Sequence, residues 1–129
     1  MASFRELDSL RVTLDQLVYT PKLETPAERP YPFAYYLTIT NLSEETVTIR
    51  GRKWVLTDAQ GHRIVVEGDG VVGKTPCLKP GERFSYHSYH VIATDSVAEG
   101  AFFAINASGE PVATRIPRFE MKIPREKKE

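Results

Sequence analysis

The spacing of three glycines is the pattern in this sequence that most clearly suggests a binding function. These glycines are Gly68, Gly70 and Gly73, in the pattern G-x-G-x-x-G. In a dinucleotide-binding βαβ unit, this spacing lets the backbone approach a pyrophosphate group at the N-terminus of a helix. We expect a strand before the motif, over residues 63–67, but Pro76 and Pro80 would break any helix after it. The sequence therefore argues against a dinucleotide-binding fold.

The same glycines could bind an anion without a helix, because successive backbone amides can form a small anion-binding concavity. Lys74 would add a positive charge, whereas Glu67 and Asp69 place two carboxylates beside the loop. One hypothesis is therefore that the protein is a sensor, which binds a phosphorylated nucleotide or a pyrophosphate group through the three glycines and Lys74. The alternative, which we favour, is structural: glycines permit positive φ and close backbone contact in a long inter-strand loop.

The other polar residues predict neither a metal centre nor a catalytic site. On a strand, His87 and His90 are an odd interval apart and point to opposite faces, so they form a poor chelating pair. We expect both of them, and His62, at the surface. Glu67 and Asp69 supply two oxygen-bearing side chains, too few for a hard cation such as magnesium. For these reasons we expect no metal and no cofactor. No G-x-S-x-G motif is present either, and we expect no enzymatic activity.

Length, charge and cysteine content narrow the class of protein. The 129 residues suit one domain, and 17 acidic against 17 basic residues argue against a nucleic-acid-binding surface. The single cysteine, Cys77, excludes an intramolecular disulfide and is expected to be a packing or loop residue. Residues 1–8 do not resemble a signal peptide, and no segment has membrane-spanning length. We expect a cytoplasmic protein with no nucleic-acid or membrane partner.

Short strands must position the glycine stretch. Residues 7–19 fit a helix by their leucine spacing and a strand by alternation over 12–19; we favour the strand. Four prolines make residues 20–32 a connector. Further strands are expected, in order, at 33–41, 46–51, 54–57, 63–67, 82–92, 101–106, 111–116 and 119–123, with a bulge near Gly51. Roughly seven to nine short strands predict an all-β, immunoglobulin- or fibronectin type III-like antiparallel β-sandwich.

The sandwich is expected as a single domain over residues 1–129, with a core at about 12–124 and a mixed-charge tail at 125–129. Tyr36 lies on the face of its strand opposite Leu37 and Ile39. Tyr36, Tyr89 and Tyr31 are therefore the candidates for an exposed aromatic patch. Exposed aromatic side chains suit protein–protein contact, and sheet edges can accept a partner strand. The same unpaired edges are compatible with a monomer or a weak homodimer.

Several runs of residues combine into a long and specific motif. They are Gly51-Arg52-Lys53-Trp54, Glu67 to Gly73, and Pro80-Gly81-Glu82, flanked by Phe33-Ala34-Tyr35 and Ile116-Pro117-Arg118-Phe119. Over residues 12–124 the sequence resembles the ApaG family. The resemblance implies a fibronectin type III-like sandwich, in agreement with the strand pattern. One stretch departs from it: residues 95–102 keep only Gly100 and Phe102 of a Gly-x-Met-x-Gly-x-Tyr-like run.

The resemblance implies no agreed enzymatic activity. Related domains fused to F-box receptors and to a polymerase-interacting protein resemble protein-binding modules. The bacterial gene often neighbours a diadenosine tetraphosphate hydrolase, and the family is linked to cobalt and magnesium handling, which gives the sensor hypothesis its context. We therefore expect a non-enzymatic module that presents residues 68–76 and an adjacent sheet face to a protein partner, with the phosphate sensor as the alternative.

Overall fold

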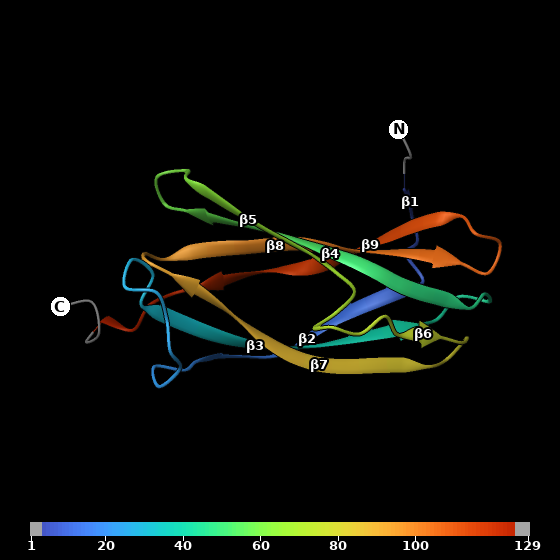
Figure 1. Ribbon diagram of the computed structural model, residues 1–129, viewed down its shortest axis with the longest axis horizontal. Coiled ribbons are helices and arrows are strands. Elements are labelled where there is room, and N and C mark those ends of the chain that lie inside the picture. Colours follow the sequence, from blue (N-terminus) through green and yellow to red (C-terminus); the bar gives the residue numbers. More distant parts are fainter. Residues whose placement is uncertain (1–3, 126–129) are drawn as a thin grey trace.

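The computed structural model describes residues 4–125, which fold into two facing β-sheets (Figure 1). The strands are β1 (Arg5–Glu6), β2 (Leu10–Tyr19), β3 (Tyr31–Asn41), β4 (Val47–Asp58), β5 (Arg63–Asp69), β6 (Cys77–Leu78), β7 (Arg83–Ile92), β8 (Ser96–Asn106) and β9 (Pro111–Met121). Of the charged tail expected at residues 125–129, only Arg125 lies within the described part of the chain. The predicted all-β sandwich is confirmed.

The larger sheet has the order β1-β9-β8-β4-β5, with the short strand β6 also paired to β4. The smaller sheet has the order β2-β3-β7. Neighbouring strands are antiparallel except β1 and β9, which run parallel, so the sandwich is antiparallel apart from this one edge pair. The β4–β5 hairpin rises away from the smaller sheet at the free end of the larger one (Figure 1).

A single apolar core lies between the sheets because the strands alternate in the expected way. On β3, the side chains of Phe33, Tyr35, Leu37 and Ile39 are buried, while Tyr36 between them is exposed. Trp54 of β4 is the largest fully buried side chain. Period-two alternation places one set of residues inside and the other outside, which is what a two-layer sandwich requires.

Residues 10–19 form a strand, which confirms the preference for strand over helix there. Their leucine spacing imitates a helix in part because β2 is irregular: its register against β3 shifts between Leu14 and Gln16. The bulge predicted near Gly51 is also confirmed, since the register of β4 against β8 shifts between Ile49 and Gly51. A bulge adds one residue to a strand and reverses the face on which the following side chains lie.

Two strand predictions were wrong. The strand expected at 101–106 begins earlier than predicted, because β8 starts at Ser96. Gly100 lies within this strand, and a Cβ there would lie 2.7 Å from the carbonyl oxygen of Lys53, so the glycine allows close contact between β4 and β8. The strands expected at 111–116 and 119–123 are one strand, β9, and Pro117 lies within a bulge opposite the register shift between Ala98 and Gly100. Prolines are tolerated in strands at such bulges.

The two-residue strands β1 and β6 were not predicted, since neither is long enough to show an alternating pattern.

Candidate functional site

The glycine loop (residues 68–76) interrupts an edge strand of the larger sheet. β5 pairs with β4 from Thr57 back to Gly51, and β6 pairs with the start of β4. Between them the amide of Gly70 donates to the carbonyl of Arg50 (2.7 Å), and the amide of Ile49 donates to the carbonyl of Pro76 (2.9 Å). β5 and β6 therefore run along the same edge of β4, and residues 71–75 leave that edge and return to it.

The tip of the glycine loop is a tight two-residue turn. Val71 and Lys74 exchange backbone hydrogen bonds of 2.6 and 3.0 Å. The two residues between them, Val72 and Gly73, have φ values of 50° and 79°, as in a type I′ turn. Val71 is fully buried in the core, whereas Val72 is 51% exposed. The loop is thus anchored by one valine and presents the other to solvent.

Each glycine of the motif has a structural role. Gly70 has a φ of 60°, and a Cβ there would overlap the carbonyl oxygen of Lys74. Gly73 is the second of the two left-handed residues of the turn. Gly68 lies in β5, where a Cβ would lie 2.7 Å from Nη1 of Arg52. These three constraints agree with the structural interpretation of the motif.

The structure brings the predicted site residues together at the end of β5 and in the turn after it, and several backbone amides there donate within the fold. The amides of Gly70, Val71 and Lys74 all donate to backbone carbonyls. Nη1 of Arg52 donates to the carbonyls of Asp69 (3.0 Å) and Gly70 (3.1 Å). After Gly73 the described chain continues through a turn into β6 rather than into a helix. Of the four candidate residues, Gly70 and Lys74 therefore already have engaged amides.

The histidines divide between surface and core. His87 and His90 lie on opposite faces of β7, as predicted; His87 is exposed and stacks on Tyr36 at 5.1 Å between ring centroids. The expectation that His90 is a surface residue was wrong, since only 5% of it is exposed. Its ring packs 4.6 Å from those of Tyr35 and Trp54, and burial lowers its pKa to about 4. The odd interval that separates two residues onto opposite faces necessarily turns one of them inward.

Within residues 4–125, no cluster of three or more histidine, cysteine or acidic side chains is placed to hold a metal ion. No helix among residues 4–125 is long and apolar enough to cross a membrane. Cys77 lies in β6 as an exposed free thiol, so it is not a packing residue.

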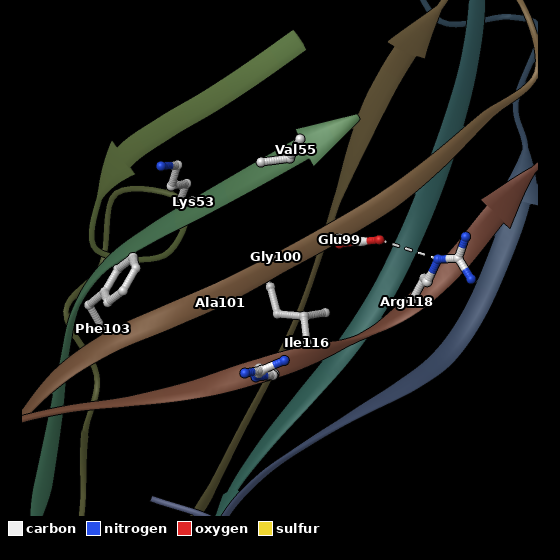
Figure 2. Close-up of a pocket in the computed structure, with 9 residues that line it drawn as sticks. Lys53, Val55, Glu99, Gly100, Ala101, Phe103, Ile116 and Arg118 are labelled. Atoms are coloured by element: carbon white, nitrogen blue, oxygen red, sulfur yellow. Dashed lines mark ion pairs between the residues drawn. The ribbon is translucent and has the colours of Figure 1, made fainter. Parts of the chain in front are cut away.

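A trough on the outer face of the larger sheet was not predicted. It runs along β8 and has a volume of about 600 Å³. Its lining residues are Lys53 and Val55 of β4, Glu99, Gly100, Ala101 and Phe103 of β8, and Arg115, Ile116 and Arg118 of β9. Figure 2 shows the small residues of β8 between the side chains of β4 and β9, which form the walls. Alternation within each strand indicates which residues face outward. It does not indicate which strands lie side by side, and the residues of this surface come from three separate strands.

The trough combines an apolar floor with a positively charged rim. Three of its lining side chains are cations and one, Glu99, is a carboxylate. Glu99 forms an ion pair with Arg118 at 3.3 Å (dashed line in Figure 2), and Arg115 pairs with Glu6 of β1 at 3.5 Å. All four of these side chains are largely exposed, and ion pairs of this kind contribute little stability.

The edge strand β5 continues this surface toward the glycine loop. Val65 is 52% exposed and pairs directly with Val55, a lining residue of the trough. Ile64, which is 38% exposed, pairs with the buried Leu56 and lies on the other face of β5. Among the described strands, β5 has β4 on one side and none on the other. Exposed apolar side chains therefore extend from the trough to a free sheet edge, and that edge ends in the glycine loop.

The exposed tyrosines of the predicted patch lie on the opposite sheet. Tyr36 of β3 and Tyr89 of β7 are both exposed, and Tyr31 is half-buried. The predicted patch therefore consists chiefly of two tyrosines and His87, on a different face of the molecule from the glycine loop.

Comparison with known proteins gives consistent matches. A model of the ApaG domain matches residues 21–106. Protein ApaG of Shewanella sediminis is 37% identical over 118 residues, covering 91% of this chain and 93% of that protein. Protein ApaG of Rhodospirillum centenum is 42% identical, over 90% of this chain and 89% of that protein. The crystal structure of an ApaA protein from Bordetella pertussis has a TM-score of 0.79 at 31% identity, covering 95% of this chain and 99% of that one.

Proposed function

This chain belongs to the ApaG family, and we propose from that premise that it is a non-enzymatic module that binds a protein partner. The partner contributes an extended segment that pairs with the free edge of β5, beside the glycine loop. One observation carries the proposal: this edge is unpaired among the described strands and exposes Ile64 and Val65.

An exposed edge strand offers a row of backbone donors and acceptors to any extended chain. Proteins usually protect such edges with charges, and β5 does carry Arg63, Glu67 and Asp69. Between these charges, Ile64 and Val65 remain available for apolar contact. A partner strand would satisfy the backbone groups, bury the two apolar side chains and pair with the flanking charges, which would also fix its register.

The exposed tip of the glycine loop lies next along the chain. Val72 presents an apolar side chain from a left-handed backbone conformation that a β-branched residue rarely adopts. Such strain at an exposed position supports a functional role for the tip, since only the surrounding structure holds it in place.

The arrangement of titratable groups supports binding rather than catalysis. The most strongly perturbed side chains, His90 and Tyr86, belong to the aromatic core, where burial lowers the pKa of the histidine and raises that of the tyrosine. A catalytic site would bring such groups together with a nucleophile or acid in a cleft. The trough instead holds exposed cations and apolar side chains.

The proposal is tested by capture of partners from a lysate of the source cell with three immobilised proteins. They are the wild type, the edge variant Val65→Lys and the control variant Tyr89→Lys. Both variants replace an exposed apolar residue of a strand with a cation, but on opposite sheets. We expect a protein that the wild type and Tyr89→Lys retain and Val65→Lys loses. Equal retention by all three would contradict the proposal.

Titration with diphosphate tests the competing phosphate-sensor hypothesis on the same protein. Amide shifts confined to Gly68, Gly70 and Gly73, and abolished by Lys74→Ala, would support the sensor and count against the partner-strand proposal. We expect no localised shifts at millimolar diphosphate, because the surrounding amides already donate to backbone carbonyls.

A further inference from the structure

We propose that the trough on the outer face of β4, β8 and β9 binds an acidic, partly apolar segment of the partner protein. Carboxylates of that segment contact Lys53, Arg115 and Arg118, and its apolar side chains cover the floor. This inference rests on the proposed function, because it assigns a chemistry to the partner of the same module, but it concerns a different surface from the β5 edge.

The strand register places two of the cations on either side of one small residue. Lys53 of β4 and Arg115 of β9 both pair with Ala101 of β8, from opposite sides. Neighbouring strands lie about 4.8 Å apart, so the two Cα atoms are separated by roughly 10 Å. Both side chains are long, and the residue between them is an alanine. A carboxylate above Ala101 can therefore reach both cations at once.

The third cation extends this arrangement along the trough. Arg118 lies beyond Ile116 on β9, next to Glu99 (Figure 2). The existing partners of the two arginines, Glu99 and Glu6, are exposed, so a carboxylate of the partner can replace them at small cost. Glu67 of β5 is the cross-strand neighbour of Lys53 and marks the negative limit of the surface on that side.

The floor of the trough excludes a purely inorganic anion as its best occupant. Besides the buried Ile116, the floor contains Val55 and Phe103, which are partly exposed. A hydrated phosphate or sulfate would leave these apolar side chains in water, whereas a segment that alternates acidic and apolar residues would cover both kinds of surface. An extended chain has this alternation naturally, because its successive side chains point in opposite directions.

The trough is also continuous with the proposed edge site. Val65 on β5 and Val55 in the trough are directly paired, so only the width of β4 separates the two surfaces. A partner segment that pairs with β5 can place its following residues over β4 and into the trough. The acidic segment therefore adds affinity and orientation to the same complex.

The test uses the full chain and a synthetic peptide in which glutamate alternates with valine and phenylalanine. Backbone amide shifts are followed by NMR as the peptide is added. We expect shifts centred on Lys53, Ala101 and Arg115. Lys53→Gln and Arg115→Gln should each weaken binding about threefold, and the double variant about tenfold, as expected for solvent-exposed charge pairs. Raising the salt to roughly 0.5 M should weaken binding further.

The matched control is Arg11→Gln, which removes an exposed positive charge from β2 on the other sheet and should leave the affinity unchanged. Equal binding of a peptide with lysine in place of glutamate would overturn the proposal. So would shifts of the same residues by citrate at equal ionic strength, which would indicate a general anion site. Undisturbed amide dispersion in each variant shows that the fold is intact, so weaker binding reports the lost charge.

The two proposals fail in different ways. Loss of the captured partner in Val65→Lys with full retention in the Lys53→Gln/Arg115→Gln variant would keep the edge site and overturn the trough. Peptide binding in the trough without any effect of Val65→Lys on partner capture would keep the trough and overturn the edge site.

Discussion

The guanidinium group of Arg52 occupies the space that a side chain at position 68 would fill. A Cβ at Gly68 would lie 2.7 Å from Nη1 of Arg52 and 2.8 Å from its Cζ. From this position Nη1 donates to the carbonyls of Asp69 and Gly70, where β5 gives way to the glycine loop. The first glycine of the G-x-G-x-x-G pattern therefore makes room for an arginine of the same chain.

Gly68→Ala should destabilise the protein by displacing Arg52. Because the obstructing atoms belong to the end of a flexible side chain, the cost is that of its two hydrogen bonds, about 1–2 kcal/mol. Urea denaturation of Gly68→Ala, Arg52→Ala and the double variant measures this coupling. In the Arg52→Ala background, Gly68→Ala should cost less than about 0.5 kcal/mol. Additive losses would show that position 68 acts independently of Arg52.

Val72→Asn should stabilise the protein by about 0.5–1 kcal/mol. Asparagine tolerates the left-handed conformation that the type I′ turn imposes at this position, and valine does not. Thermal or urea unfolding measures the gain. The control Val65→Asn alters an exposed valine in an extended strand and should be neutral or destabilising, because asparagine is disfavoured there. A loss of stability in Val72→Asn would contradict the assigned turn.

Stability should decrease as the pH falls from about 6.5 to 4, through protonation of His90. Burial lowers the pKa of His90 to about 4, whereas the unfolded chain titrates near 6.5, so the unfolded state binds the proton first. The contribution is complete above pH 6.5 and is lost as the pH approaches 4, with a total of roughly 3 kcal/mol. Nε2 of His90 has no hydrogen-bond partner within residues 4–125, and its neighbouring rings are Tyr35, Trp54 and Phe119.

The measurement is the free energy of unfolding at several pH values for wild type, His90→Phe and His87→Phe. Phenylalanine at position 90 should flatten the slope between pH 4 and 6.5. The control removes an exposed histidine from the same strand and should leave the slope unchanged. An equal slope in His90→Phe and the wild type would assign the pH dependence to other groups.

The alternation of apolar residues was sufficient to predict the sandwich and the exposed position of Tyr36. It could not predict the trough, because Lys53, Ala101 and Arg115 become neighbours only through the pairing of three strands. That pairing depends on register, and register depends in part on bulges. The bulge before Gly51, for example, places Arg52 on the same inward face as Phe102, where an arginine would not be expected.

The lack of a helix after the glycine stretch could be predicted from the sequence. Pro76 and Pro80 argued against a helix, and the structure has none between Gly73 and β7 in this described part of the chain. The role of Arg52 and the exposed tip at Val72 could not be predicted, because both depend on where β6 returns to β4.

The most direct test of the account is photo-cross-linking of the full chain in the source cell. A photo-reactive amino acid replaces Val65 on the free edge of β5, and in a second protein it replaces Tyr89 on the opposite sheet. We predict a protein that cross-links from position 65 and not from position 89, and whose cross-linked residues lie in an extended segment rich in acidic and apolar side chains. Cross-linking of the same protein with equal yield from position 89, or of no protein from position 65, would contradict the assignment of β5 as the binding edge.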